Sequence, residues 1–336
     1  MKAVAYQKPF AISDADVFSI IDIEQPKAIG FDLLVKVKAI SVNPVDIKMR
    51  QRTSPENTDW KILGHDAVGT VVAIGELVKN FKVGDDVFYA GSNQRQGSYA
   101  EYQLVDERIV GFKPSRLSDA EAVALPLTAL TAYEMLFDRL KVQDTKSEKP
   151  MILVIGAAGG VGSIAVQLLK AITEFTVIAT ASRPESQAWL QEIGADFVID
   201  HRQDLEKQVS MLNIGQPNYV FSINGTGQYT QSIANLIAPQ GHFGLIDDPE
   251  NFVINPFKIK SISIHWESMF TRSTFQTRDI SRQGDILNKI SKLANDQRIK
   301  TTLGQNLGKI NVENIVEAHR LIESGKSIGK IVLEGF

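Results

Sequence analysis

The sequence predicts an α/β protein with two domains, one rich in β-strands and one built on a doubly wound parallel sheet. The first 125 residues hold short strand patterns separated by turns, whereas strand and helix patterns alternate from residue 150 onward. Such alternation is typical of a parallel sheet with helices on both faces. A length of 336 residues also fits two domains better than one.

The amino-terminal part is predicted to form a small barrel or sandwich. Its runs "FDLLVKVKAISV", "AVGTVVAIG", "GDDVFYA" and "GSYAEYQLV" are short and separated by Gly, Asp and Asn turns. Short strands at this spacing are typical of all-β architectures. The pattern turns helical at about Ser118, which stands in a capping-box arrangement with Glu121.

Six apolar strand runs follow: "MILVIG", "TVIATA", "DFVID", "NYVFSI", "GHFGLI" and "SISIHW". Helical patterns lie between them over residues 160–172, 184–193, 202–212 and 227–236. Six strands match the doubly wound dinucleotide-binding fold. The tail adds helical patterns over 280–296 and 312–324 and a last strand, "IGKIVLE". That strand lies outside the six, so we expect it to return to the first domain.

The segment "GAAGGVG" joins the first of these strands to a helix, and Ala157, Gly159 and Gly162 fit the fingerprint A-x-G-x-x-G. Gly159 would let the backbone approach a pyrophosphate, and Gly162 would let the helix pack closely on the strand. The helix N-terminus, with Gly160 and Val161, offers N–H donors to phosphates. The strand–turn–helix context favours a dinucleotide site; a tight turn that binds nothing is the alternative.

The end of the second strand indicates which dinucleotide binds. NAD-preferring folds carry an acidic residue there, about 20 residues after the glycine turn. This chain has Thr180, Ala181 and Ser182, followed by Arg183. A carboxylate would repel a 2′-phosphate, whereas Arg183 can bind it; as an alternative, Arg183 is a solvated charge before a helix that starts with proline. The missing acid predicts NADPH rather than NADH.

Composition narrows the classes of partner and site. The net charge of −3 gives no reason to expect nucleic acid. No apolar run approaches the roughly 18 residues of a membrane span, and the first residues show no signal core, so we expect a cytoplasmic protein. The chain has no cysteine, so neither disulfides nor thiolate zinc sites are possible. Its five histidines are scattered, without metal-ligand spacing.

Seven strings occur in one order along nearly the whole chain: "NPVDIK", "GHDAVGTVVAIG", "FKVGDDVF", "GSYAEY", "LPLTALTAYE", "AAGGVG" and "SIGKIVL". The ordered set resembles the medium-chain dehydrogenase/reductase superfamily, and within it the NADPH:quinone oxidoreductase group and its zinc-type alcohol dehydrogenase-like branch. The resemblance implies a GroES-like barrel domain, residues 1–125 and 275–336, around a Rossmann domain, residues 126–274. Family members pair edge strands into dimers, so a homodimer is expected. Trp266 and Phe270 lie at and just after the end of the sixth strand run. These aromatic residues are compatible with a dimer interface, a covered cleft or core packing.

The chain departs from the zinc alcohol dehydrogenases at their metal ligands. Asn43 stands where those enzymes have a ligand Cys, and this resembles the quinone reductases. His65 matches a ligand His, but Asp66 follows it in place of Glu, and the third ligand position, near Ala124, has no Cys. A site made of His65 with Asp46 or Asp66 stays an alternative. Because strand neighbours point to opposite faces, we predict no bound catalytic zinc.

Without zinc no strong Lewis acid activates an alcohol. Hydride transfer from NADPH to a quinone or an α,β-unsaturated carbonyl asks only for positioning and for hydrogen bonds to the developing oxyanion. A zinc-dependent alcohol or aldehyde dehydrogenase and an NADPH-binding sensor are the alternatives. Asn43 and Thr128 match family positions that line the nicotinamide cleft, so they are candidate substrate contacts. Alternatively, Asn43 makes the turn before Pro44 and Thr128 bonds its own helix.

The remaining candidates rest on the resemblance. Asp46 and His65 are expected to form a polar pair that stabilises a loop, with proton donation as the alternative. Lys48 stands where many quinone reductases have an active-site Tyr, so it is either a buried proton donor or a solvated lysine. His201 in "VIDHRQ" replaces the Tyr of a common Asn-Tyr-Arg sequence, near the cofactor or at the surface. Asn224 and Lys330 complete the predicted cofactor contacts.

Overall fold

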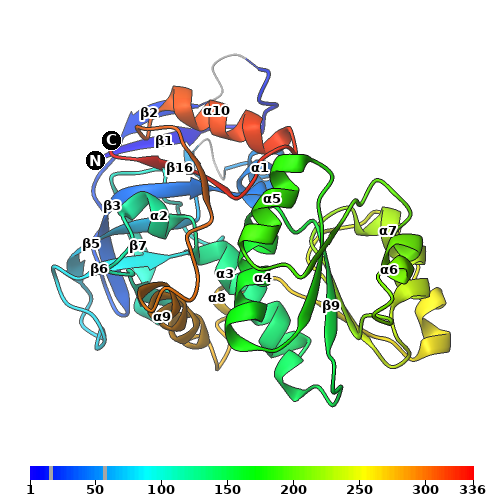
Figure 1. The fold of residues 1–336 in the computed structure, drawn as a ribbon. Helices are drawn as coiled ribbons and strands as arrows, with labels where there is room; N and C mark the ends of the chain where they lie inside the picture. The colour runs from blue at the N-terminus through cyan, green and yellow to red at the C-terminus, as the bar shows by residue number, and fades with distance from the viewer. Residues whose placement is uncertain (15–17, 56–58) are drawn as a thin grey trace. The chain divides into compact units, whose positions relative to one another are not determined.

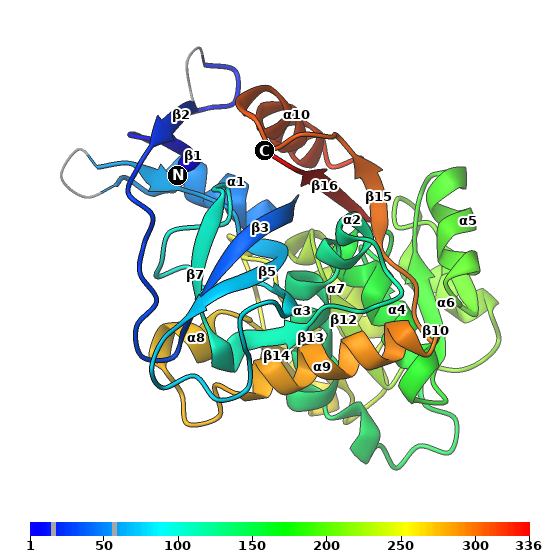
Figure 2. The same cartoon turned by 90° about the vertical axis from the view of Figure 1, so that its left-hand side faces the viewer.

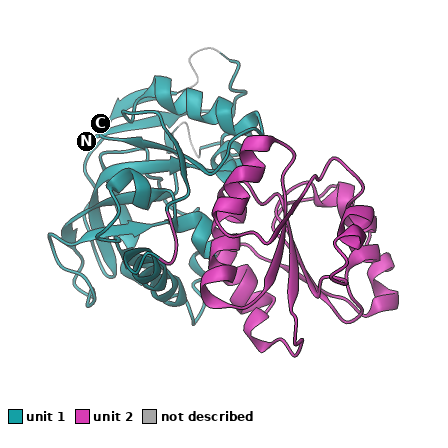
Figure 3. Cartoon of the chain, in the orientation of Figure 1, with its two compact units in different colours: residues 1–130, 270–297, 301–336 teal, residues 131–269, 298–300 magenta. Residues whose placement is uncertain are grey.

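The computed structural model describes residues 1–14, 18–55 and 59–336 (Figure 1). The chain forms two compact units, which are described separately (Figure 3). Unit 1 comprises residues 1–130, 270–297 and 301–336, and unit 2 comprises residues 131–269 and 298–300.

Unit 1 is built on two sheets that are mostly antiparallel. The larger has the order β15-β16-β3-β5-β6-β8, with β7 pairing β3, and the smaller has the order β2-β1-β4. The last strand, β16, pairs antiparallel with β3, so the predicted return of the chain's end to the first domain is confirmed. The strands are β1 (Lys2–Tyr6), β2 (Ser19–Asp22), β3 (Asp32–Val42), β4 (Lys61–Ile62), β5 (Asp66–Ile74), β6 (Asp86–Tyr89), β7 (Tyr102–Asp106), β8 (Val110–Phe112), β15 (Leu303–Asn306) and β16 (Lys330–Glu334).

Strand β3 is the centre of unit 1, because it pairs with β5, β7 and β16. Its residues are buried almost without interruption. Two register shifts in its pairing with β5 let the long strand bend around the core. The helices of unit 1 are α1 (Pro44–Arg52), α2 (Asp119–Val123), α8 (Thr271–Phe275), α9 (Arg282–Asn295) and α10 (Val312–Glu323), of which α10 lies beside β16 (Figure 2). Helix α3 (Pro126–Tyr133) begins in this unit.

Unit 2 is a six-stranded parallel sheet with the order β11-β10-β9-β12-β13-β14. Counted along the chain this is the order 3-2-1-4-5-6, so the predicted doubly wound sheet is confirmed. Helices α4 and α5 lie on one side of the sheet and α6 and α7 on the other (Figure 1). The elements are β9 (Met151–Ile155), α4 (Gly160–Ile172), β10 (Thr176–Thr180), α5 (Pro184–Glu192), β11 (Phe197–Ile199), α6 (Leu205–Met211), β12 (Tyr219–Ser222), α7 (Thr226–Leu236), β13 (His242–Leu245) and β14 (Ser263–Trp266).

Most predicted helix boundaries in unit 2 lie within one residue of the observed ones, but the start of one helix differs by three. Helix α6 begins at Leu205 rather than at residue 202, because the Asp204 side chain caps it by accepting from the Lys207 N–H. Residues 200–203 instead form a turn after β11.

The expectation that no apolar run approaches the length of a membrane span needs correction, because one helical stretch among the described residues, 119–144, is long and apolar enough by composition alone. Its most apolar window is 89% buried within the protein. Packing inside the fold therefore accounts for its apolar composition, as for the core helices of globular proteins.

A buried polar cluster joins α1 to α10 in unit 1. The Arg50 guanidinium is fully buried, forms an ion pair with Glu323 and lies 3.3 Å from His319 Nδ1. Because a guanidinium only donates, Nδ1 must accept, and the neutral imidazole carries its proton on Nε2, 3.2 Å from the Tyr99 hydroxyl. Burial lowers the pKa of His319 to about 4, against the opposing charge of Asp46.

His319 makes stability fall in mild acid. An unfolded histidine has a pKa of about 6.5, above the folded value, so the unfolded state takes up the proton first. The stability present above pH 6.5 is therefore lost as the pH falls towards 4, by about 2 kcal/mol at pH 5. Urea unfolding at pH 7.5 and pH 5 measures this loss. The His319→Gln variant should lose about 2 kcal/mol less between the two pH values; an equal loss in both proteins would contradict the assignment.

Candidate active-site and cofactor-binding residues

The turn between β9 and α4 depends on glycines for two different reasons. A Cβ on Gly162 would lie 2.4 Å from the Ala157 backbone, so the helix approaches the turn too closely for any side chain. A Cβ on Gly159 would have no atom of the chain closer than 3.8 Å, and its φ of −76° suits any residue. Nothing within the chain requires glycine at position 159. A ligand seated on the helix N-terminus would require it.

The surroundings of the turn fit the phosphates of a dinucleotide. The first hydrogen bond into α4 comes from the Ser163 N–H, so Gly160, Val161 and Gly162 precede it with the N–H groups that helices leave unsatisfied. The Asn224 side chain lies against the turn, since a Cβ on Gly156 would be 2.3 Å from its Oδ1. The predicted contacts at the turn and Asn224 therefore lie together in unit 2.

The two glycines give a matched pair of variants. Gly159→Ala should fold normally and bind NADPH at least about tenfold more weakly, because the methyl group occupies the space of the pyrophosphate. Gly162→Ala should lose about 2 to 3 kcal/mol of stability through the clash with Ala157. NADPH fluorescence titration and urea unfolding measure the two effects. Unchanged NADPH affinity in Gly159→Ala would contradict this account of the turn.

The predicted phosphate-reading residues lie at the end of β10. Ser182 and Arg183 are half-buried, and Arg183 Nε lies 3.5 Å from Glu185 Oε1. Arg202, which is not among the residues predicted from the sequence, donates from Nη2 to the Ser182 carbonyl at 2.7 Å. Arg202 is the last residue of Asp200-His201-Arg202, the segment that matches the common Asn-Tyr-Arg sequence. That match could have identified Arg202 from the sequence. His201 Nδ1 is buried without a partner among the described residues, and burial lowers the pKa of His201.

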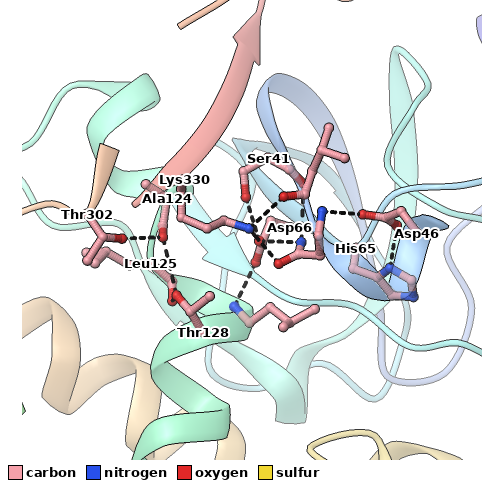
Figure 4. Close-up of polar contacts among 12 residues, drawn as sticks. Ser41, Asp46, His65, Asp66, Ala124, Leu125, Thr128, Thr302 and Lys330 are labelled. Carbon is pink, nitrogen blue, oxygen red and sulfur yellow. Dashed lines mark hydrogen bonds and ion pairs between the residues drawn. The ribbon is translucent and has the colours of Figure 1, made fainter. Parts of the chain in front are cut away.

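Asp66 is the centre of a buried polar cluster in unit 1 (Figure 4). Its carboxylate stands at the start of β5 and has four donors from three segments of the chain. They are Ser41 Oγ at 2.6 Å, Asn43 Nδ2 at 2.8 Å, the Leu127 N–H at 2.7 Å and Lys330 Nζ at 3.3 Å. These hydrogen bonds and the ion pair compensate for the removal of the carboxylate from water.

Lys330 balances that charge. Its ammonium donates to Asn43 Oδ1 at 2.5 Å and to the Val42 carbonyl at 2.9 Å, and it pairs with Asp66. An ammonium has three N–H donors, so each has a partner within unit 1. Burial lowers the pKa of Lys330, with Asp66 opposing. The structure thus places Lys330 in the polar cluster, and its predicted contact with the cofactor stays a prediction.

Asp46 and His65 form the expected polar pair. Asp46, in the first turn of α1, accepts from the Asn43 N–H at 2.8 Å through Oδ2, and its Oδ1 lies 2.7 Å from His65 Nδ1. Burial raises the pKa of Asp46, but His65, His319 and the Asn43 N–H together leave the pKa below its usual value. The Phe270 ring packs 4.8 Å from the imidazole, centroid to centroid. Among the described residues, His65 Nε2 has no partner.

The other predicted catalytic residues have separate environments. Both ends of the Asn43 amide are used, since Nδ2 donates to Asp66 and the Ser41 carbonyl and Oδ1 accepts from Lys330. A hydrogen bond from Nδ2 to a substrate oxygen would cost one of its two bonds. Thr128 donates to the Leu125 carbonyl at 3.1 Å, which is the helix bond foreseen as its alternative role. Lys48 is half-buried in α1.

Residues 1–14, 18–55 and 59–336 contain no group of three His, Asp or Glu side chains placed to hold a metal ion. Position 124, where the zinc enzymes have a ligand, contributes only a backbone carbonyl, which accepts from Thr302 Oγ1. Trp266 is 57% exposed at the end of β14, against Phe252. Whether Trp266 contacts a second copy of the chain stays a prediction.

Two family descriptions match the chain: "Alcohol dehydrogenase GroES-like domain" over residues 30–115 and "Zinc-binding dehydrogenase" over residues 160–282. A zinc-type alcohol dehydrogenase-like protein of Staphylococcus aureus is 41% identical over 336 residues, 99% of each chain. The 2-methylene-furan-3-one reductase of Solanum lycopersicum is 30% identical over 90% of this chain and 71% of its own.

Solved structures of dehydrogenases and quinone oxidoreductases also resemble this chain. A Rhizobium etli protein assigned as a zinc-dependent alcohol dehydrogenase has a TM-score of 0.98 and 52% identity, covering 100% of this chain and 98% of its own. The quinone oxidoreductase of Escherichia coli, solved with NADPH, has a TM-score of 0.81 at 22% identity, covering 99% of this chain and 100% of its own. At that identity the likeness shows the fold, which in the bacterial enzyme holds a nicotinamide dinucleotide.

Proposed function

Because the chain belongs to the medium-chain dehydrogenase/reductase superfamily, in its quinone oxidoreductase-like group, we propose that this oxidoreductase reduces quinones or α,β-unsaturated carbonyls with NADPH and without zinc. One observation carries the proposal. Of the side-chain nitrogens of Asn43, His65 and Lys330, His65 Nε2 alone lacks a partner among the described residues. His65 Nε2 is therefore the one of these nitrogens that is free to exchange a proton with a substrate.

The glycine turn and Arg183 hold the cofactor in this proposal. Gly159 leaves room for the pyrophosphate at the start of α4, and Arg183 provides a positive charge for the 2′-phosphate. When bound, NADPH supplies a hydride. The relative from Solanum lycopersicum supports the acceptor class, because its name describes the reduction of a 2-methylene-furan-3-one, which is an α,β-unsaturated ketone.

His65 handles the proton that balances the hydride. A quinone or enone gains negative charge on its oxygen as it is reduced, and a positioned donor stabilises that charge. Asp46 accepts from the Nδ1–H of His65, so a proton taken up from water goes to Nε2, and Asp46 stabilises the imidazolium. Nε2 then donates this proton to the substrate oxygen. Hydride and proton together complete the two-electron reduction.

A panel of acceptors tests the proposed class. Oxidation of NADPH is followed at 340 nm with quinones and enones, and reduction of NADP⁺ is followed with simple alcohols. We expect turnover with the first set and none with the alcohols. Turnover of alcohols alone would favour an alcohol dehydrogenase, and NADPH binding without any turnover would favour a sensor. A homodimer, a cytoplasmic location and the absence of nucleic-acid partners remain predictions.

A further inference from the structure

Arg202 bridges the loops that follow β10 and β11 in unit 2. Its Nη2 donates to the Ser182 carbonyl at 2.7 Å and to Asp200 Oδ2 at 2.8 Å, and its Nε lies 3.1 Å from Asp200 Oδ1. The guanidinium is thus fixed beside the residue at which dinucleotide folds read the adenine ribose. Its Nη1 has no partner among the described residues, and the side chain is 62% exposed. Arg202 therefore presents donors of fixed orientation at this position.

Asp200 is what fixes Arg202. Its backbone is held independently, because Gln208 accepts from the Asp200 N–H at 2.9 Å and donates to its carbonyl at 2.8 Å. The carboxylate is therefore not needed to shape the loop. The hydrogen bonds from Arg202 lower the pKa of Asp200, which keeps the carboxylate ionised. His201, between the two, has its buried Nδ1 unpartnered, so this turn still has a polar atom without a partner.

The pair has opposite consequences for the two nicotinamide cofactors. A 2′-phosphate gains hydrogen bonds from Arg202 but meets a pair whose net charge is near zero, because Asp200 cancels the guanidinium. A free ribose 2′-hydroxyl can donate to a carboxylate, as it does to the acidic residue of NAD-preferring folds.

We propose that Asp200, through its clamp on Arg202, sets the choice of cofactor and makes the enzyme accept both NADPH and NADH, with only a modest preference for NADPH. The proposal rests on the proposed function, because it deepens the description of that cofactor site. Asp200, which follows β11, thus takes the role of the acidic residue that is missing at the end of β10.

Substitution of Asp200 by Asn removes the negative charge of the side chain and keeps its size. Asp200→Asn keeps an acceptor for Arg202 and leaves the two Gln208 contacts to the backbone intact. We expect NADPH to bind about tenfold more tightly and NADH to bind more weakly. Arg202→Gln should weaken NADPH binding by at least about tenfold and change NADH binding little. Glu174→Gln, an exposed site before the start of β10, makes the same change of net charge as Asp200→Asn and serves as its control.

The dissociation constants of NADPH and NADH, measured by nicotinamide fluorescence on the full chain, test the proposal. The wild type should bind both, NADPH only several-fold more tightly, and the NADPH preference of Asp200→Asn should exceed that of Glu174→Gln about tenfold. An unchanged preference in Asp200→Asn, a shift towards NADH, or failure of the wild type to bind either dinucleotide would overturn the proposal. Normal dinucleotide binding without reduction of any quinone or enone would instead overturn the proposed function alone.

Discussion

Replacing Lys330 by methionine is expected to lower the free energy of unfolding by about 3 to 5 kcal/mol. Lys330 and Asp66 are both buried, and Nζ is also bonded to Asn43 Oδ1 and the Val42 carbonyl. Methionine matches the length of the lysine stem but leaves the Asp66 carboxylate without its counter-charge in a medium of low dielectric constant. Urea unfolding at pH 7.5 measures the loss, with the exposed Lys309→Met as the control.

A second variant separates charge from packing. If the loss comes from an uncompensated carboxylate, then adding Asp66→Asn to Lys330→Met should recover part of it, because the double variant buries no net charge. Strictly additive losses in the two single variants would show that Lys330 and Asp66 do not interact energetically. That result would contradict the description of the cluster.

Replacing His65 by glutamine should lower kcat with a quinone or enone about 10²- to 10³-fold. Glutamine can still donate to Asp46 Oδ1, which lies 2.7 Å from Nδ1 in the wild type, but it carries no proton to transfer. The affinity for NADPH should stay within about twofold, since His65 lies in unit 1 and the glycine turn in unit 2. Steady-state kinetics and NADPH titration measure the two quantities.

His242→Gln serves as the histidine control, because His242 is not among the candidate residues. It is the first residue of β13, which is separated from β9 by β12 in the sheet of unit 2. Its kcat should equal that of the wild type. Asp46→Asn should also lower kcat, by less than His65→Gln, since Asp46 acts by orienting the imidazole and stabilising its charged form. Full activity in His65→Gln would remove His65 from the mechanism.

The fold and the glycine turn could be predicted because both depend on local sequence. The alternation of strands and helices determines the six-stranded sheet, and the spacing of Ala157, Gly159 and Gly162 reflects the contact of α4 with its own turn. The pairing of Asp46 with His65 was also expected, because the ordered motifs carry both residues.

Contacts between distant segments could not be predicted. Lys330 joins Asn43 across 287 positions of the chain, and only the pairing of β16 with β3 brings them together. The role of Arg202 depends in the same way on two loops, since its partners are Asp200 and the Ser182 carbonyl, 20 positions away. Sequence motifs identify such residues as candidates for a functional site, but tertiary packing determines which partners they bind.

The central claim is that this chain reduces quinones or enones with NADPH and needs no metal, and the most direct test is NADPH oxidation at 340 nm by chelator-treated protein. The account predicts that turnover with a quinone or an enone survives chelation and does not increase when zinc is returned. Loss of turnover on chelation, with recovery on addition of zinc, would contradict the metal-free mechanism and make the chain a zinc-dependent dehydrogenase.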